Sequence, residues 1–571
     1  MFSQNERRER IVSPARSFCL SLVVMFSSLK FLVAPFMLAV TLTCGLRPSA
    51  RAPNLPDNGP GDEERAAKMV AGGAAALERG ETTTAKSFFR RALAMDPKNI
   101  TARTYLGIIA DRAGELAEAE RQFAAAAAAA PSSPEVRNNH GAILLKLGRK
   151  QEAAAEFKAS LRLDPRQPAA LVNLAQIRFA AGSLQGLREA QELFERARAI
   201  APDAETARAL IVIALRLHES AKAAAEFPDY SARLGGAPES VAAPPARAEL
   251  GAALLEAGLA KEAAGELDAA VQADPSSVNE IVLLARAYHE QKNDEAAGRA
   301  LESALARGVE AAPLFTALAE IYEVSGQIEK AIPAMRRAIQ LDPTSEALRF
   351  RYAMLLTSAN APQAAVIRLR EALDEFPGSS KLWFAMGVAQ FTDNKNKDAA
   401  NAFSRALERD PKMSPALAYL GMICDDEGRI LDAVAYYQKA IAAEEPSAVN
   451  HYLIAETFSK FTSADDDHAQ EHLKRALELD PGFLQAHLAL GKLYLRANRF
   501  QDAAEELEGV VRADPKLAEA YYHLSRVYTR LKRREDAQTA AGKFEQLSND
   551  QKQQSENERR EIVRRLANVR Y

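Results

Sequence analysis

Two histidines four positions apart, His468 and His472, are the residues of this chain best placed to do chemistry. On a helix they would lie one turn apart on the same face, where two imidazole nitrogens can hold one metal ion. Glu471 stands between them, and three aspartates precede them at 465–467. The sequence has no phosphate-binding G-x-x-x-x-G-K-[ST], no G-x-S-x-G and no C-x-x-C. Whether the two histidines form a site therefore depends on the element that carries them.

That element belongs to a repeat. A fixed period of 34 residues indicates one supersecondary unit copied many times. Ala469 occupies the repeated alanine position of its copy, so the segment is predicted to be a second helix with aspartates at its N-terminus. The order H-x-x-E-H, which also occurs in one class of zinc peptidases, then lies on a structural helix, and no metal, cofactor or catalytic residue is expected. The regular alanines are Ala85, Ala119, Ala153, Ala263, Ala297, Ala331, Ala365, Ala399, Ala433, Ala503 and Ala537.

Other positions of the period have physical reasons. A glycine five residues before the alanine, such as Gly114, is predicted to cap the first helix in the left-handed conformation. A small residue twelve before the alanine, such as Gly141, is predicted to mark a close helix crossing together with the alanine. A large side chain four after it, such as Phe157, would lie on the same face. Pairs such as Asp410-Pro411 are predicted to end the second helix and start the next one.

This combination resembles the tetratricopeptide repeat. The resemblance implies an all-α fold, a right-handed superhelical solenoid of antiparallel helix pairs. About thirteen recognisable repeats and one degenerate unit lie between residues 66 and 549. Trp383 stands where the family keeps its tryptophan, and only one copy has it. The first-helix tyrosine of the family is matched by Tyr288, Tyr322, Tyr494 and Tyr528.

Departures from the period suggest how the chain is divided. One copy carries three extra residues around Ser183-Leu184-Gln185, and residues 203–245 contain a helical run followed by clusters of proline and glycine. We interpret this segment as a degenerate repeat and loop between two lobes. The predicted divisions are a signal or anchor segment at 1–46, a Pro/Gly-rich linker at 47–62, an N-terminal lobe at 63–202, the degenerate segment at 203–245, a C-terminal lobe at 246–549 and a capping helix at 550–571.

The composition argues against a nucleic-acid partner. The 73 basic and 76 acidic residues are spread evenly, which leaves a net charge of −3 and no basic stripe. Basic clusters at Arg530–Arg534 and Arg559–Arg565 are interleaved with acidic residues, as on solvated helix faces. Protein or peptide partners are expected instead.

The N-terminal 46 residues can be interpreted in two ways. From Met1, the apolar stretch Ser17–Leu46 is long enough to span a bilayer and follows several arginines. From Met25, the chain has a compact export signal that ends at the A-x-A site Ala50-Arg51-Ala52. Either interpretation predicts an exported or membrane-anchored protein. If the apolar segment is not used, the protein would be cytoplasmic.

Two of the three cysteines have a specific expectation. Cys44 follows Leu42-Thr43 and precedes a glycine, as in a bacterial lipoprotein box, which makes it a candidate for lipidation. Cys424 takes the tyrosine position of its repeat and is expected to pack in the core.

The predicted capping helix has one apolar stripe that includes Ile562 and Leu566, because a terminal repeat needs a polar outer surface.

First helices line the concave groove in the tetratricopeptide family, so the resemblance implies partner-binding residues there. Asn139 and Asn173 are 34 residues apart at the sixth place of consecutive first helices, where O-GlcNAc transferases keep an asparagine ladder for peptide backbone. Two solvated asparagines are the simpler alternative. Tyr419 and His523 hold the equivalent place in the C-terminal lobe.

The expected function is a non-catalytic protein–protein interaction scaffold that binds extended peptide or partner segments. An envelope assembly, secretion or polysaccharide-export complex is the leading setting. The alternatives are a soluble adaptor or co-chaperone and the non-catalytic subunit of an enzyme complex. A catalytic domain is not expected, because only about 22 residues follow the last repeat.

Overall fold

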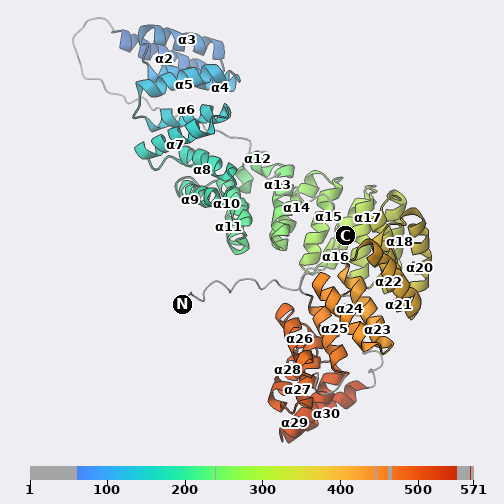
Figure 1. Ribbon diagram of the computed structural model, residues 1–571. Coiled ribbons are helices and arrows are strands. Elements are labelled where there is room, and N and C mark those ends of the chain that lie inside the picture. Colours follow the sequence, from blue (N-terminus) through green and yellow to red (C-terminus); the bar gives the residue numbers. More distant parts are fainter. Residues whose placement is uncertain (1–60, 238, 444–446, 461–465, 549–565, 567–571) are drawn as a thin grey trace. The chain divides into compact units, whose positions relative to one another are not determined.

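The structure is a computed structural model that describes residues 61–237, 239–443, 447–460, 466–548 and 566 (Figure 1). These residues contain helices and no strand, and consecutive helices pair along the chain. The described chain divides into two compact units at residues 300 and 301. The first unit contains α2 (Asp62–Glu78), α3 (Thr82–Met95), α4 (Ile100–Arg112), α5 (Leu116–Ala129), α6 (Pro134–Lys146), α7 (Lys150–Leu163), α8 (Pro168–Ala180), α9 (Leu184–Ile200), α10 (Ala204–Arg216), α11 (Ser220–Arg233), η2 (Leu234–Gly236), α12 (Glu239–Ala242), α13 (Pro244–Glu256), α14 (Ala260–Ala273) and α15 (Val278–Glu290).

The division falls within α16 (Asp294–Ala306), which pairs in sequence with α15. The second unit continues with α17 (Ala312–Val324), α18 (Ile328–Leu341), α19 (Glu346–Ser358), α20 (Pro362–Glu375), α21 (Ser380–Thr392), α22 (Asn396–Arg409), α23 (Ser414–Asp426), α24 (Ile430–Ala443), α25 (Ala448–Phe458), α26 (Asp466–Leu479), α27 (Leu484–Arg496), α28 (Phe500–Ala513), α29 (Ala518–Arg530) and α30 (Arg534–Leu547).

Each pair consists of a first helix and a second helix, for example α21 and α22. First helices of neighbouring pairs also contact each other, as α19 contacts α21 and α27 contacts α29. Within the described chain, the second helices make no contacts of similar extent with one another. The first helices therefore form the inner layer of the stack and the second helices the outer layer, which confirms the predicted all-α solenoid of helix pairs.

The turn within each pair needs a residue in the left-handed region. The predicted cap glycines adopt it, with φ of 76° at Gly114 and 74° at Gly428. Some copies place a residue with a side chain there, including Lys292 at φ 64° and Lys532 at φ 60°. These copies carry backbone strain that glycine would remove.

The small residue of the first helix is required by an aromatic ring sixteen residues later. A Cβ atom added at Gly387 would lie 2.5 Å from Cε1 of Phe403, and one added at Gly141 would lie 2.8 Å from Cε1 of Phe157. Both rings are fully buried. The sequence pattern attributes this close approach to the alanine twelve residues after the glycine, whereas the structure shows the ring in that space.

The Asp-Pro pairs end the second helix as predicted, but their proline does not start the next helix. The aspartate ends the second helix, as Asp164 does for α7, but the proline lies in the turn and not in the first turn of the next helix. The aspartate side chain accepts a hydrogen bond from the backbone N–H two residues on, at 2.9 Å from Arg166 to Asp164 and 3.0 Å from Lys516 to Asp514. This is an Asx turn, which satisfies a backbone donor that the helix end leaves free.

The extra residues of the fourth pair lengthen its second helix. Ser183 is the N-cap of α9, and its hydroxyl accepts a hydrogen bond from the backbone N–H of Gly186 at 3.0 Å. The helix therefore has three more residues before its repeated alanine than α7 has, while Ala190 and Phe194 stay four residues apart and buried.

The segment at 203–245 contains the helix pair α10 and α11, followed by the short elements η2 and α12. Helix α11 passes through Pro228 and continues to Arg233. Tyr230 and Val241 are buried in a core cluster that runs from Ala175 to Ala287. The predicted loop between two lobes is therefore short, and the hydrophobic core is continuous across it.

Several predictions fall on residues outside those described. They are the signal or anchor segment at 1–46, Cys44 and nearly all of the linker at 47–62. Within the described residues, none of the helices has the length and hydropathy needed to cross a bilayer. Of the predicted capping helix at 550–571, only Leu566 is described, and it is buried in the core cluster of the second unit. Cys424 is a buried free thiol, as expected.

A charged row on the first helices

Asn139 and Asn173 lie on the first helices α6 and α8 and are completely buried. The Nδ2 of Asn173 donates a hydrogen bond to Oδ1 of Asn138, the neighbour of Asn139, at 3.2 Å. The amides of Asn138 and Asn173 therefore join the first helices α6 and α8. The prediction that they face a partner is corrected by this burial. The repeat spacing identifies the helix face, but whether the side chain is covered depends on how closely the next first helix approaches.

Tyr419 also lies in the interior. Its ring stacks on Phe403, with centroids 4.9 Å apart, and meets Phe391 edge-on at 5.3 Å. Burial raises the pKa of its hydroxyl above the usual value. A fully buried tyrosine cannot reach a partner, so Tyr419 is corrected from a groove residue to a core residue.

His523 differs from the other three predicted residues because it belongs to a charged cluster. Its Nε2 lies 3.5 Å from Oε1 of Glu519, and Nζ of Lys492 lies 3.0 Å from the same oxygen. The hydrogen bond from His523 and the charge of Lys492 hold the pKa of Glu519 at about 2. Glu519 is therefore ionised at neutral pH and links the first helices α27 and α29.

The cluster extends to two earlier first helices. Lys460, directly after α25, forms an ion pair with Asp425 on α23. Nη1 of Arg496, at the end of α27, donates to the carbonyl oxygen of Ser459 at 3.0 Å. Glu456 lies between these groups, and burial raises its pKa. We call this set the first-helix row: Asp425, Glu456, Lys460, Lys492, Arg496, Glu519 and His523.

The first-helix row crosses four consecutive first helices of the inner layer. Its cations remain accessible, with 53% of the Lys460 side chain and 39% of the Lys492 side chain exposed. The row could not be found from the repeat period of the sequence because its members occupy different positions of the period and include both signs of charge. The signal that could have revealed the row is the presence of charged residues on the polar faces of the first helices α23, α25, α27 and α29.

His468 and His472, the two histidines of the H-x-x-E-H sequence, contact different residues. On α26, His472 places its Nδ1 2.9 Å from Nδ1 of His451 on α25, while the ring of His468 packs against Phe458. Burial lowers the pKa of both His451 and His472, so the contact joins neutral rings. In the described part of the chain, no three potential ligands gather closely enough to hold a metal.

The helix pairs, the left-handed turns and the small–aromatic contacts define a helical-repeat protein whose inner layer bears the candidate site. Two family models described as tetratricopeptide repeat match the chain, one at 76–142, 325–387 and 467–524 and the other at 139–205 and 384–448. Together these matches cover more than half of the 571 residues. The chain belongs to the tetratricopeptide repeat family and is a scaffold of that type for protein interactions.

The chain is similar to parts of larger proteins. It is 30% identical over 171 residues to the probable UDP-N-acetylglucosamine–peptide N-acetylglucosaminyltransferase SPINDLY of Hordeum vulgare, a match that covers 29% of this chain and 18% of the barley protein. It is 28% identical over 185 residues to anaphase-promoting complex subunit 3 of Schizosaccharomyces pombe, covering 31% of this chain and 26% of that protein. The chain thus spans about a quarter or less of either relative.

Two solved structures match over most of the chain. The APC/C hetero-tetramer Cut9-Hcn1 gives a TM-score of 0.36 at 14% identity, covering 81% of this chain and 96% of that one. Yeast Tom70 gives a TM-score of 0.36 at 14% identity, covering 83% and 97%. At these TM-scores, neither structure adds an argument about function.

Proposed function

We propose that the protein is a non-catalytic scaffold that binds an extended segment of a partner protein along the first-helix row. The observation that carries this proposal is the row itself, in which acidic and basic side chains follow one another across four neighbouring first helices. A long row of this kind matches an extended chain better than a small ligand, because successive residues of the partner can meet successive helices.

The charges of the row support exchangeable contacts. Partly exposed ion pairs such as Lys460 with Asp425 contribute little to folding, roughly 0–1 kcal/mol each. Their lysine or arginine can therefore turn to a partner's carboxylate at small cost. Complementary charges would set the register of the partner and speed its association at low salt.

Site-specific photo-crosslinking tests this surface. A photo-reactive amino acid at Arg496, on the inner layer, should crosslink a partner protein in the native membrane fraction. The same amino acid at Lys474, which is exposed on the outer-layer helix α26, serves as the matched control. A partner captured equally at both positions, or only at Lys474, would refute the proposed surface.

The affinity of the identified partner gives the second measurement. Lys460→Ala combined with Arg496→Ala should weaken binding about tenfold, since each lost charged hydrogen bond costs about 1.5–3 kcal/mol before water replaces it. Lys474→Ala should leave affinity unchanged. Circular dichroism should be the same for all variants, because the three side chains are exposed at the surface.

The proposed setting is an envelope assembly, secretion or polysaccharide-export complex. It rests on the apolar N-terminal segment followed by an A-x-A site. Mass spectrometry of the protein from its native source gives the mature N-terminus. A start at Met25 or just after Ala52 supports export, whereas an intact N-terminus on protein from the cytosolic fraction contradicts it.

A non-catalytic subunit of a larger complex is the second candidate. The match to anaphase-promoting complex subunit 3, a protein named as a subunit of a complex, favours it. Stoichiometric co-purification of this chain with a catalytic protein would distinguish this alternative from an envelope scaffold. A soluble adaptor would instead copurify with varied client segments.

A further inference from the structure

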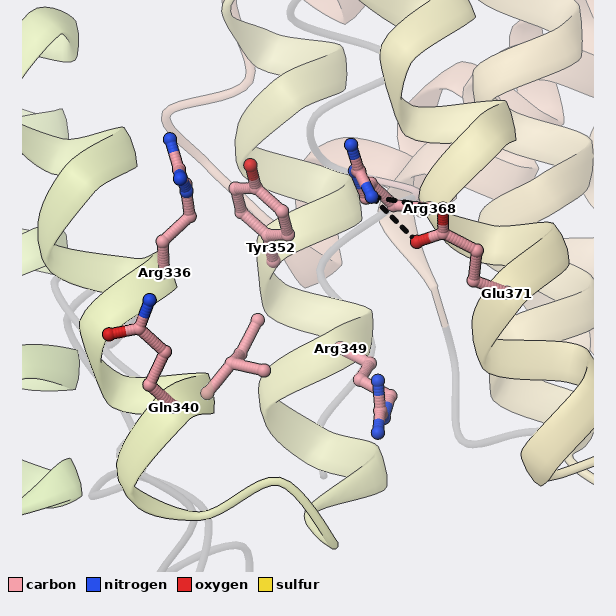
Figure 2. A pocket seen from close by; sticks show the side chains of 7 residues that line it. Arg336, Gln340, Arg349, Tyr352, Arg368 and Glu371 are labelled. Atoms are coloured by element: carbon pink, nitrogen blue, oxygen red, sulfur yellow. Dashed lines mark hydrogen bonds and ion pairs between the residues drawn. The ribbon is translucent and has the colours of Figure 1, made fainter.

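A cavity of about 370 Å³ opens between the second helix of one pair and both helices of the next, namely α18, α19 and α20 (Figure 2). It lies within the second unit, on helices that carry no residue of the first-helix row. Arg336, Arg349 and Arg368 line it, with Glu371 as the single acidic lining residue. The cavity wall therefore carries an excess of positive charge.

The three arginines differ in how many hydrogen bonds and ion pairs they already form with other residues of the chain. Arg368 is paired with Glu371, Nη1 to Oε2 at 2.7 Å. Arg349 donates from Nη2 to Glu375 at 2.5 Å and to the carbonyl oxygen of Pro343 at 2.6 Å, and its Nε is buried without a hydrogen-bond partner in the described chain. Arg336 forms no ion pair or hydrogen bond with any described residue and is exposed at the cavity. Accessible donor capacity is thus available from the Arg336 guanidinium.

Tyr352 adds a neutral donor to the same wall. Its ring stands between the side chains of Arg336 and Arg368 (Figure 2), and its hydroxyl makes no hydrogen bond with the described residues. Gln340, on the same side as Arg336, can donate from its amide as well. Guanidinium groups and a phenol are donors that recognise oxygen anions, and Arg336 and Tyr352 are the two that are not already paired with Glu371 or Glu375.

We propose that this cavity binds an oxyanion, a phosphate or a carboxylate, through Arg336 and Tyr352. Such a group can come from a modified or acidic side chain of a partner or from a free small anion, and the chemistry of recognition is the same. The site is independent of the first-helix row, so it gives the scaffold a second point of attachment on its outer layer.

Calorimetric titration of the full-length protein with inorganic phosphate tests the site, with sodium chloride at equal ionic strength as the reference. Saturable binding of phosphate is expected. Arg336→Gln should weaken it about tenfold, the loss of one charge-assisted contact, and Tyr352→Phe should weaken it less. The matched control is Arg370→Gln, because Arg370 is exposed on the same helix as Arg368 but lies outside the cavity lining.

Acetate and phenyl phosphate, titrated in parallel, decide between the sources. Tighter binding of phenyl phosphate than acetate assigns a phosphorylated ligand, and the reverse assigns a carboxylate. Phosphate and acetate binding no better than chloride would overturn the proposal. So would equal effects of Arg336→Gln and Arg370→Gln. Crosslinking at Arg496 should be unaffected by Arg336→Gln, so failure of this site and failure of the first-helix row can be told apart.

Discussion

The hydroxyl of Tyr230 on α11 donates a hydrogen bond to Oε2 of Glu266 on α14 at 3.1 Å, and thereby joins two neighbouring second helices. Glu266 is almost completely buried, and Arg247 neutralises it with two hydrogen bonds of 3.0 Å, from Nε and Nη2. Burial and the charge of Glu266 raise the pKa of Tyr230 above its usual value, so the tyrosine remains a donor at any physiological pH. This network fixes the irregular pair at 203–245 to the regular repeats that follow.

Removing the cation of this network should destabilise the first unit. Arg247→Met leaves the buried Glu266 charge with the tyrosine alone, and breaking a buried pair in this way costs about 3–5 kcal/mol. Hydrogen exchange should accelerate in α11, α13 and α14. Arg233→Met, which breaks the partly exposed pair with Asp229, should cost less than about 1 kcal/mol.

The network also bears on proteolysis. The proline and glycine clusters at 227–245 predict this segment as the first site of cleavage. We expect trypsin to cut there faster in Arg247→Met than in the wild-type protein. Equal cleavage rates in the two proteins would show that the Tyr230–Glu266 contact does not hold the segment.

The contact between the small residue and the ring predicts a strong effect of a single methyl group. Gly387→Ala would place its Cβ 2.5 Å from the buried Phe403 ring, and we expect a loss of about 1–3 kcal/mol from overpacking. Gly509→Ala, in the second helix α28 with open space around it, should be neutral or stabilising by up to about 1 kcal/mol. Chemical unfolding measures both, and equal changes would refute the role of the ring.

The neutral histidine pair predicts that stability falls in mild acid. Burial and the neighbouring His472 lower the pKa of His451 from 6.5 to about 4. Between these values the unfolded chain binds a proton that folded His451 does not, so the free energy of unfolding decreases as the pH falls from 6.5 to 4. His451→Asn should flatten this part of the profile of melting temperature against pH.

His487 gives a control with the opposite sign. Its hydrogen bond to Glu506 raises its pKa, so its contribution to stability is present at low pH and is lost as the pH rises through the folded value. His487→Gln should therefore steepen the acid loss that His451→Asn reduces. If both variants shift the profile in the same direction, the assignment of the neutral pair is wrong.

Leu566 predicts that the C-terminal tail contributes to the core. It is 5% exposed and belongs to the cluster that contains Tyr528 and Ala540 of the last pair. Leu566→Ala should cost about 2–5 kcal/mol, as for other buried leucines. Leu431→Ala, on a side chain that is 82% exposed, should have little effect. Deleting residues 552–571 should lower the melting temperature at least as much as Leu566→Ala does, and an unchanged melting temperature would exclude a packed tail.

Much of the fold could be predicted from the sequence because the same residue types recur at the same positions from one repeat to the next. The left-handed turn at Gly114 and the need for a small residue at Gly141 depend on residues within one repeat, and their period is visible. The pattern did not show that the Phe157 ring, and not Ala153, fills the space beside Gly141. The path of α11 through Pro228 could not be predicted, since the packing of Tyr230 overrides the local signal for a break.

The site was harder to predict because the burial of its side chains depends on packing between repeats. Position in the period identified the inner helix face for Asn173 and Tyr419, but the neighbouring first helix and the rings of other repeats bury them. Burial of a first-helix side chain is a property of two or three repeats together. His523 lies on a first helix beside Glu519, and its charged neighbours have no common spacing.

The Asx turns have a consequence for how such a chain can change its length. The same hydrogen bond, from the second residue after the aspartate back to its side chain, closes the junction after Asp96, Asp164, Asp410 and Asp514. A gene segment duplicated or lost between two of these junctions would rejoin one Asx turn to another of the same geometry. The array can therefore grow or shrink by whole helix pairs without a new linker, and only the packing of the newly adjacent faces has to be adjusted by later mutation.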